Sequence, residues 1–108
     1  MKIKNLTPHP IKILDDDNNV IFRAPGCNES PRAEENREQV DEIDNIPVNK
    51  LSLGQVKNLP DPEPGVILIV SRVIAEACPR RPDLYVPDEK ARDEEGRIVG
   101  CRALAVVN

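Results

Sequence analysis

Aromatic residues are nearly absent from this chain of 108 residues, which contains one Phe, one Tyr and no Trp. A core must therefore be built from Val, Ile and Leu, without the large burial per residue that aromatic rings supply. Hydrophobic residues are also few, at 39% of the sequence. We expect one small domain over residues 1–108, and because so small a core is only marginally stable alone, we expect a homo-oligomer.

Cysteine and histidine are too few for a disulfide framework or a zinc site. Cys27, Cys78 and Cys101 are odd in number and have no C-x-x-C spacing. His9 is the only histidine, so a metal cluster based on histidines is excluded. We expect reduced cysteines, no metal and no cofactor.

Neither an excess of positive charge nor a long apolar run is present. The net charge is −4, and an acidic chain with two aromatic residues is poorly suited to binding a nucleic-acid backbone or stacking single-stranded bases. No apolar run approaches the length of a membrane span, and no signal-peptide core follows residues 1–3. We therefore expect a cytoplasmic protein whose partners include neither a nucleic-acid polymer nor a membrane.

The basic residues change type along the chain. Residues 1–64 contain five Lys and three Arg, whereas residues 65–108 contain one Lys and six Arg. Arg suits bidentate recognition of phosphate or carboxylate and tolerates partial burial better than Lys. The second half is therefore the expected place of an anion-binding site. The alternative is that these arginines provide solubility and pair with neighbouring acids.

The segment over residues 65–88 organises the predicted fold. Residues 66–70 form an unbroken apolar run, which is typical of a strand covered on both faces. Ser71 follows at an N-cap position, residues 72–78 contain helix formers, and Pro79 ends the helix. This pattern predicts a central strand that leads into one short helix and then an Arg-Arg loop.

Short strands are predicted on both sides of this unit. The Asp- and Asn-rich residues 15–19 are the expected turn of one hairpin, and residues 93–96 are the turn of another, with Gly96 at positive φ. Gly100 is placed to form a bulge or to let another backbone approach. The expected fold class is α+β, a small single domain with mainly an antiparallel or mixed β-sheet and one short helix. Strands are expected over residues 1–7, 11–14, 20–23, 84–86 and within 91–107.

Residues 27–45 give the least regular pattern, with seven acidic residues and two strong hydrophobes. A helix over residues 33–43, a mobile loop and a short strand around residues 32–34 are all compatible with it. We favour an acidic variable loop with some strand character. The following residues, 46–59, predict a separate hairpin that turns at Leu53 and Gly54.

The ends of the short helix form the first candidate site. Its start offers free backbone N–H groups to an anion, with Ser71 and Arg72 at that end. Arg80 and Arg81 follow the other end. The alternative is that Ser71 only caps the helix and that the arginines pair with nearby acids.

Two further clusters are candidates. The segment over residues 5–9 carries an amide, a hydroxyl and the only imidazole on a strand broken by prolines, and broken strands are common at sites. Its candidate residues are Asn5, Thr7 and His9, and a His9 that only closes a turn is the alternative. The third cluster is the C-terminal hairpin, flanked by Arg92 and Arg102, for which the alternative is a charged turn facing solvent.

Recognisable catalytic motifs are missing. The sequence contains no phosphate-binding or dinucleotide-binding glycine loop, no nucleophile elbow, no H-E-x-x-H and no helix-turn-helix pattern. We therefore assign no catalytic residue and expect that the protein is not an enzyme.

Four stretches of the sequence resemble a family of small proteins encoded mostly in phages and prophages. They are N-L-T-P-H over residues 5–9, I-P-V with L-G-Q-V-K-N-L-P within 46–60, P-G-V-I-L-I-V-S-x-V-I-A-E-A-x-P-x-R-x-D over 64–83, and R-D-E-E-G-R-I-V-G-x-R over 92–102. The resemblance covers most of the chain except residues 27–45. In class, the chain is similar to viral sponges that sequester the nucleotide signals of bacterial Thoeris and CBASS defence.

The resemblance implies a phage protein that acts in the host cytoplasm and sequesters a phosphate-bearing nucleotide, either ADP-ribose-derived or a cyclic dinucleotide. The pocket would be shared between subunits, and Tyr85 and Phe22 would have to stack the base. Two alternatives remain, a phosphodiesterase-like enzyme with His9 as acid or base, and a structural or accessory virion protein. The expected ligand-binding residues are Asn5, Thr7, His9, Ser71, Arg72, Arg80, Arg81, Arg92 and Arg102.

Overall fold

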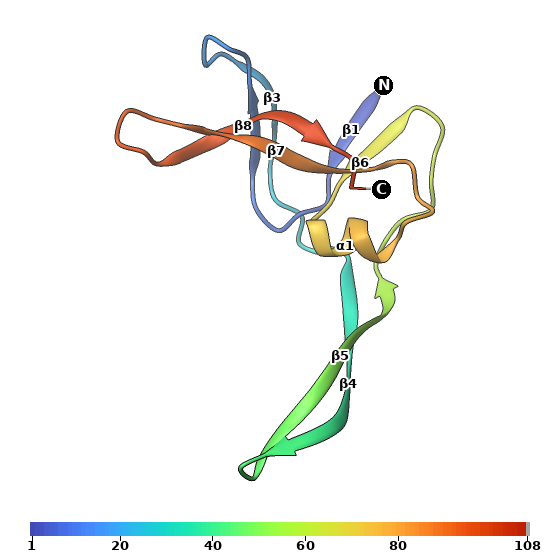
Figure 1. Cartoon of the computed structure of the whole chain (residues 1–108). Coiled ribbons are helices and arrows are strands. Elements are labelled where there is room, and N and C mark those ends of the chain that lie inside the picture. The colour runs from blue at the N-terminus through green and yellow to red at the C-terminus, as the bar shows by residue number, and fades with distance from the viewer. Residues whose placement is uncertain (108) are drawn as a thin grey trace.

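A computed structural model describes residues 1–107 as a small, mainly β domain with one short helix (Figure 1). Strands account for 54% of the residues and the helix for 6%, which confirms the expectation of a β-rich fold with a single helix. In chain order the elements are β1 (Lys2–Asn5), β2 (Ile11–Leu14), β3 (Val20–Ala24), β4 (Arg32–Ile43), β5 (Ile46–Lys57), β6 (Val66–Ile69), α1 (Arg72–Ala77), β7 (Leu84–Arg92) and β8 (Ile98–Ala105).

Six of the strands form one mixed sheet in the order β1-β6-β7-β8-β2-β3. The parallel pairs are β1 with β6, β6 with β7, and β2 with β8. The hairpins β2–β3 and β7–β8 are antiparallel. The sheet is therefore mixed, which is one of the two arrangements, antiparallel or mixed, that the sequence predicts.

The β6 strand is covered on both faces, as its unbroken apolar sequence predicts. Ile69 is fully buried and packs in a cluster with Ile13 and Cys101. Its neighbours Leu68 and Val70 pack in a second cluster that includes residues of α1 and β7. Because successive residues of a strand point to opposite faces, β6 joins the two halves of the core.

The helix α1 is held by packing rather than by a side-chain cap. Ser71 has the extended backbone of an N-cap residue, but its side chain makes no capping hydrogen bond. Ile74 and Ala75 are buried against the sheet. Within residues 1–107, no helix has the length and apolar character needed to span a membrane.

The turns predicted at residues 15–19 and at residues 93–96 are both present. The Asp15 carboxylate accepts hydrogen bonds from the backbone N–H groups of Asp17 and Asn19, at 2.9 and 2.8 Å, and closes the β2–β3 turn. In the β7–β8 turn, the carboxylate of Asp93 accepts two backbone N–H groups, and Gly96 has a φ of 83°. The strand predicted over residues 84–86 extends much further, to Arg92, because β8 pairs along it.

The prediction for residues 27–45 is wrong over most of its length. Residues 32–43 form neither a loop nor a helix but the twelve-residue strand β4, which pairs antiparallel with β5 along its whole length. Ten register pairs join β4 to β5, and this pairing supplies the hydrogen bonds of the strand. The acidic sequence of β4 alone does not indicate a strand. The β4–β5 ribbon is called the arm below.

The predicted hairpin within residues 46–59 is also wrong, because β5 continues through Leu53 and Gly54 with only a shift in its register to β4 and no reversal of the chain. The turn lies earlier, at Asp44 and Asn45, which have φ values of 49° and 66°. Two consecutive residues at positive φ are characteristic of a type I′ turn, the favoured connection of a two-residue hairpin loop. Ile43 and Ile46 face each other directly across it.

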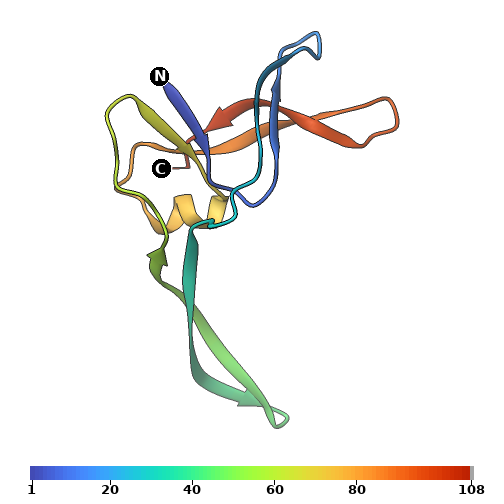
Figure 2. The same cartoon turned by 180° about the vertical axis from the view of Figure 1, so that it is seen from behind.

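The arm projects from the body of the molecule beside α1 (Figures 1 and 2). Only its root packs on the core, where Ala33 and Val56 touch the cluster that contains Ile74. The radius of gyration is 17.2 Å, whereas a compact domain of this length has about 13 Å. The arm therefore extends well beyond the packed body.

Candidate functional site

A hollow lies beside the loop that follows α1 and has a volume of about 390 Å³. Arg80 and Arg81 line it together with apolar side chains from the same loop and from the end of β8. We call it the arginine hollow. Its remaining lining residues are Pro79, Pro82, Leu84, Val106 and Val107.

Arg81 is held in a fixed position by several hydrogen bonds. Its guanidinium donates from Nε and Nη2 to the two carboxylate oxygens of Asp83, both at 2.9 Å, and from Nη2 to the carbonyl oxygen of Pro60 at 2.8 Å. The side chains of this pair are only 20% and 11% exposed. The hydrogen bond from Arg81 lowers the pKa of Asp83, and the same bond raises the pKa of Arg81. A bidentate pair of this kind fixes the plane of the guanidinium.

Arg80 has a different environment from its neighbour. Its side chain is exposed, and within residues 1–107 it forms no hydrogen bond or ion pair. Since the charge of Arg81 is balanced by Asp83, Arg80 supplies the uncompensated positive charge of the hollow. An anion that enters would therefore meet the exposed charge of Arg80, unpaired within residues 1–107, and a fixed Arg81 whose Nε and Nη2 are already hydrogen-bonded.

Asn5 and Thr7 form a network that holds the chain after β1. The Asn5 amide donates to the carbonyl oxygens of His9 and Pro25, each at 2.9 Å. Its Oδ1 accepts hydrogen bonds from the backbone N–H and hydroxyl of Thr7, at 3.0 and 2.7 Å. The polar side-chain atoms of Asn5 and Thr7 are thus occupied by each other and by backbone groups, and His9 contributes its carbonyl while its side chain is exposed.

Ser71 and Arg72 lie at the start of α1 and outside the arginine hollow. Arg72 donates from Nε to Glu76, one turn later, at 2.9 Å, and its side chain is 75% exposed. This is the i,i+4 pairing with a nearby acid that the sequence left open as the alternative. Such an exposed pair contributes little to stability.

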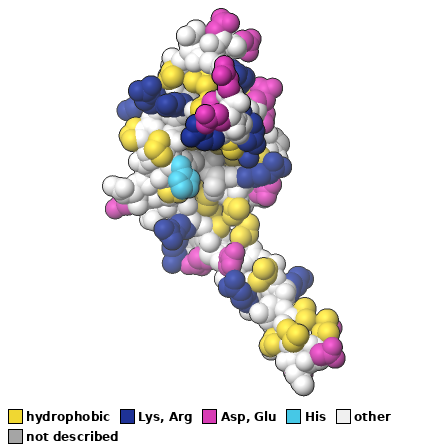
Figure 3. Space-filling model, turned by 90° about the vertical axis from the view of Figure 1, so that its left-hand side faces the viewer, with side chains coloured by type: hydrophobic (Ala, Val, Ile, Leu, Met, Phe, Trp, Pro, Cys, Tyr) yellow, Lys and Arg dark blue, Asp and Glu magenta, His cyan; other side chains and the backbone are white. Residues whose placement is uncertain are grey.

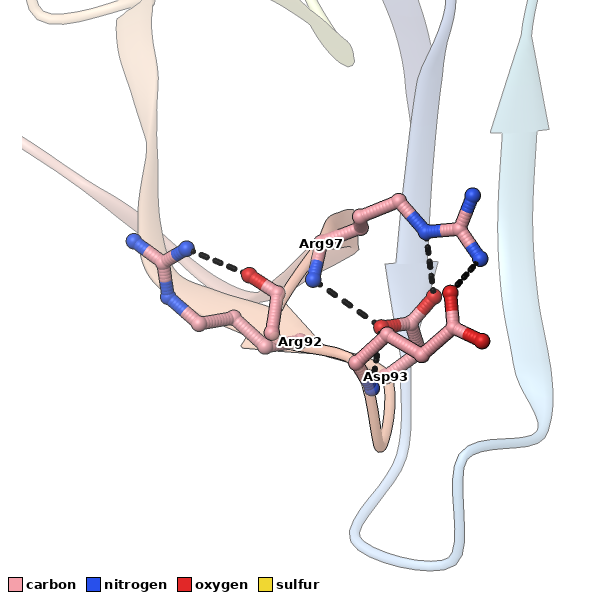
Figure 4. Close-up of polar contacts among 5 residues, drawn as sticks. Arg92, Asp93 and Arg97 are labelled. Atoms are coloured by element: carbon pink, nitrogen blue, oxygen red, sulfur yellow. Dashed lines mark hydrogen bonds and ion pairs between the residues drawn. The ribbon is translucent and has the colours of Figure 1, made fainter.

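The two hairpin arginines bind backbone oxygens of turns. Arg92 donates from Nη1 to the carbonyl oxygen of Gly96 at 2.8 Å, as Figure 4 shows. In the same turn Arg97 pairs with Asp93 and Glu95. Arg102, further along β8, donates to the carbonyl oxygen of Asp15 and the side chain of Asn18 in the β2–β3 turn.

Of the nine residues that the sequence selected, only Arg80 and Arg81 line the arginine hollow, and the other seven lie elsewhere. Phe22 and Tyr85 do not line the hollow either. Sequence reasoning missed Val106 and Val107, which reach it because β8 pairs with β7 in a register that sets Ala105 opposite Val86. The sequence predicts the turn of this hairpin, but it predicts a strand over residues 84–86 only and not the long pairing that carries the chain after β8 back to the Arg-Arg loop.

The described residues contain no group of three or more His, Cys, Asp or Glu side chains placed to hold a metal ion. The three cysteines are free, and burial raises the pKa of the Cys101 thiol. Comparison with protein-family models, with curated proteins and with solved structures gave no match.

Proposed function

We propose that this protein binds a small phosphate-bearing nucleotide in the arginine hollow and holds it intact. The observation that supports this most directly is that Arg80 and Arg81 both line the hollow, where Arg80 is exposed and has no partner among the described residues, and Arg81 is fixed by Asp83 and Pro60. Phosphate oxygens accept the fork of N–H donors that a guanidinium presents. Arg80 presents this fork to a phosphate, whereas Arg81, whose Nε and Nη2 already donate to Asp83 and Pro60, adds its Nη1 donors at a position that is fixed before binding.

The other walls of the hollow suit the uncharged part of a nucleotide. Leu84, Val106 and Val107 supply apolar surface beside the arginines. A volume of about 390 Å³ lies in the range of small-molecule sites. Aliphatic walls contact a base through its faces without the stacking that aromatic rings provide, so modest selectivity among bases is expected.

Binding is favoured over cleavage by the residue types in the hollow. Its described lining contains no carboxylate, histidine or cysteine that would act as a general base or nucleophile. The resemblance of the sequence to phage proteins makes signals of bacterial defence the first ligands to test. We therefore propose sequestration of an ADP-ribose-derived or cyclic dinucleotide signal during infection.

Calorimetric titration with ADP-ribose, cyclic ADP-ribose and cyclic dinucleotides tests this proposal. The variant Arg80→Ala removes the free cation from the hollow, and the loss of one charge-assisted hydrogen bond costs about 1.5–3 kcal/mol, or roughly tenfold to more than a hundredfold in affinity. We expect at least a tenfold weaker Kd for Arg80→Ala. Heat denaturation of the wild-type complex should release the nucleotide unchanged.

Arg72→Ala is the matched control, because it removes an exposed arginine of the same region that lies outside the hollow. This variant should bind with wild-type affinity. Equal affinity of wild type and Arg80→Ala, or no binding of any of these nucleotides, would contradict the proposed site. Recovery of a cleaved product after denaturation would replace sequestration by catalysis.

A further inference from the structure

The arm presents an unusual amount of exposed apolar surface for so thin an element. Five of its aliphatic side chains are between 46% and 63% exposed, namely Val40, Ile43, Ile46, Leu51 and Leu53. Figure 3 shows hydrophobic side chains gathered at the free end of the arm, with acidic side chains next to them. An exposed patch of this kind marks an interaction surface.

The arm also lacks the packing that a two-stranded ribbon needs. Beyond its root at Ala33 and Val56, no residue of the arm belongs to either core cluster. An isolated two-stranded hairpin is only marginally stable in water. A ribbon with twelve-residue strands that projects from the body would therefore be stabilised by a surface that covers it.

A second hollow, of about 350 Å³, lies on the body between β2, β7 and β8. Its walls are mainly apolar, with Ile11, Pro87, Ile98 and Cys101 among them. The only charged side chains among its described lining residues are two lysines, Lys12 and Lys90. We call it the lysine groove.

The tip of the arm protrudes and the lysine groove is concave, and the two surfaces carry opposite charges. At the tip, Ile43 and Ile46 face each other across the strands and form a compact apolar knob. Three acids surround that knob in the sequence, Asp41, Glu42 and Asp44. An apolar knob with carboxylates on its β4 side and in its turn matches an apolar groove bordered by ammonium groups, and such complementarity selects a partner and its register.

We propose that the arm tip of one copy of this chain docks into the lysine groove of a second copy. A chain does not reach its own groove, because the arm extends away from the β7–β8 hairpin (Figures 1 and 2). Each copy gives one arm and receives another. Two copies that exchange arms form a reciprocal dimer, and a head-to-tail series of such contacts forms a ring when its rotation closes. The proposal does not depend on nucleotide binding, since neither surface includes the arginine hollow.

Sedimentation velocity at micromolar concentration tests this proposal with the full chain. The wild type should be a dimer or a larger closed oligomer. The double variant Ile43→Asp and Ile46→Asp places two charges on exposed positions of the tip and should sediment as a monomer. Its circular dichroism should still show the folded body, because neither residue touches the core.

Ile21→Asp is the matched control. Ile21 lies on β3, is 65% exposed, and belongs to neither the arm nor the groove. It undergoes the same chemical change and should leave the oligomer intact. A monomeric wild type, or a double tip variant that keeps the wild-type oligomer, would overturn the proposal.

A charge exchange identifies the groove as the acceptor. Lys12→Glu with Lys90→Glu should dissociate the oligomer by bringing like charges together, and Asp41→Lys with Glu42→Lys should do the same. Combining all four substitutions in one chain should restore assembly. If the groove variant remains fully assembled, the tip docks elsewhere and the proposed acceptor is wrong.

Discussion

At the scale of single residues, the arginines of the second half show how one residue type serves several roles. The sequence predicts that they cluster around a ligand, and their chemistry suits that role. In the structure, Arg92 and Arg102 bind carbonyl oxygens of turns, and Arg81 is paired with Asp83. Arg80 is set apart because the described residues offer it no such partner. Residue type thus indicates the class of partner, whereas only the fold decides whether that partner is a ligand.

The Arg81–Asp83 pair is expected to support folding at neutral pH. Arg81→Ala leaves a largely buried carboxylate without its donor, and loss of a hydrogen bond to a charged group costs about 1.5–3 kcal/mol. For a domain of this size we expect the Tm at pH 7 to fall by roughly 5 °C or more. Arg72→Ala, which breaks an exposed pair, should leave the Tm nearly unchanged.

The same pair predicts the direction of the pH dependence. Arg81 lowers the pKa of Asp83 in the folded state, below the value of about 3.9 in an unfolded chain. Its stabilisation is therefore fully present above pH ~4 and is lost as the pH falls through the lower folded pKa. Urea unfolding at pH 7 and at pH 2.5 should show a smaller difference between wild type and Arg81→Ala at the acidic pH. A difference that is constant with pH would show that the pair contributes through packing alone.

At the scale of elements, the sequence predicts those parts of the fold that carry local signals. The apolar run over residues 66–70, the turn that begins at Asp15 and the glycine turn at Gly96 are all recognisable, because periodicity and turn chemistry act over a few residues. β4 carries no such signal. Its acidic, exposed residues adopt a strand because β5 pairs with them, and that partner lies across a turn.

The arm shows why one missed turn leads to two wrong elements. The sequence pattern places the turn at Gly54. In the structure the turn lies at Asp44 and Asn45, because Asp and Asn tolerate positive φ without being glycine. Moving the turn toward the N-terminus converts a loop followed by a short hairpin into one long ribbon. The prediction of the candidate site is limited in the same way. Val106 and Val107 approach the Arg-Arg loop only because of the register between β7 and β8, which the sequence does not predict over its full length.

Gly100 tests how β2 joins the rest of the sheet. The sequence suggests that it permits a close approach, and the structure confirms one, because a Cβ on Gly100 would lie 2.8 Å from the carbonyl oxygen of Lys12. β2 and β8 share a single register pair, Ile13 with Cys101, so a small separation of the two strands would break their pairing. Gly100→Ala should push the strands apart and lower the free energy of unfolding by about 1–3 kcal/mol, measured by urea denaturation.

Gly65→Ala provides the comparison for that experiment. Gly65 has a positive φ, but a methyl group added to its Cα would have no atom within 4 Å, so the cost of this substitution is conformational rather than steric. Hydrogen exchange should distinguish the two variants, with faster exchange of β2 amides in Gly100→Ala only. Unchanged β2 exchange in Gly100→Ala would mean that the strands accommodate the methyl group without separating.

At the scale of the whole molecule, a small aliphatic core and a long arm point to the same property. Composition predicts an oligomer because the body alone buries little surface. The structure adds an element that projects from the body and exposes the apolar side chains that such an oligomer would cover. Assembly is thus proposed to stabilise the arm, while β6 and its two clusters stabilise the body.

This division predicts a concentration-dependent pattern of hydrogen exchange. If the tip docks on a second copy, amides around Ile43 and Ile46 should be protected at micromolar concentration and should lose that protection on dilution, because binding stabilises only what it covers. Amides of β6 should stay protected at every concentration, since their strand lies between β1 and β7 within one chain. In the double tip variant, the arm should exchange rapidly at all concentrations while β6 keeps its wild-type rates. Protection of the arm that does not change on dilution would mean that the ribbon is stable without a partner, and the exposed aliphatic residues would then require another explanation.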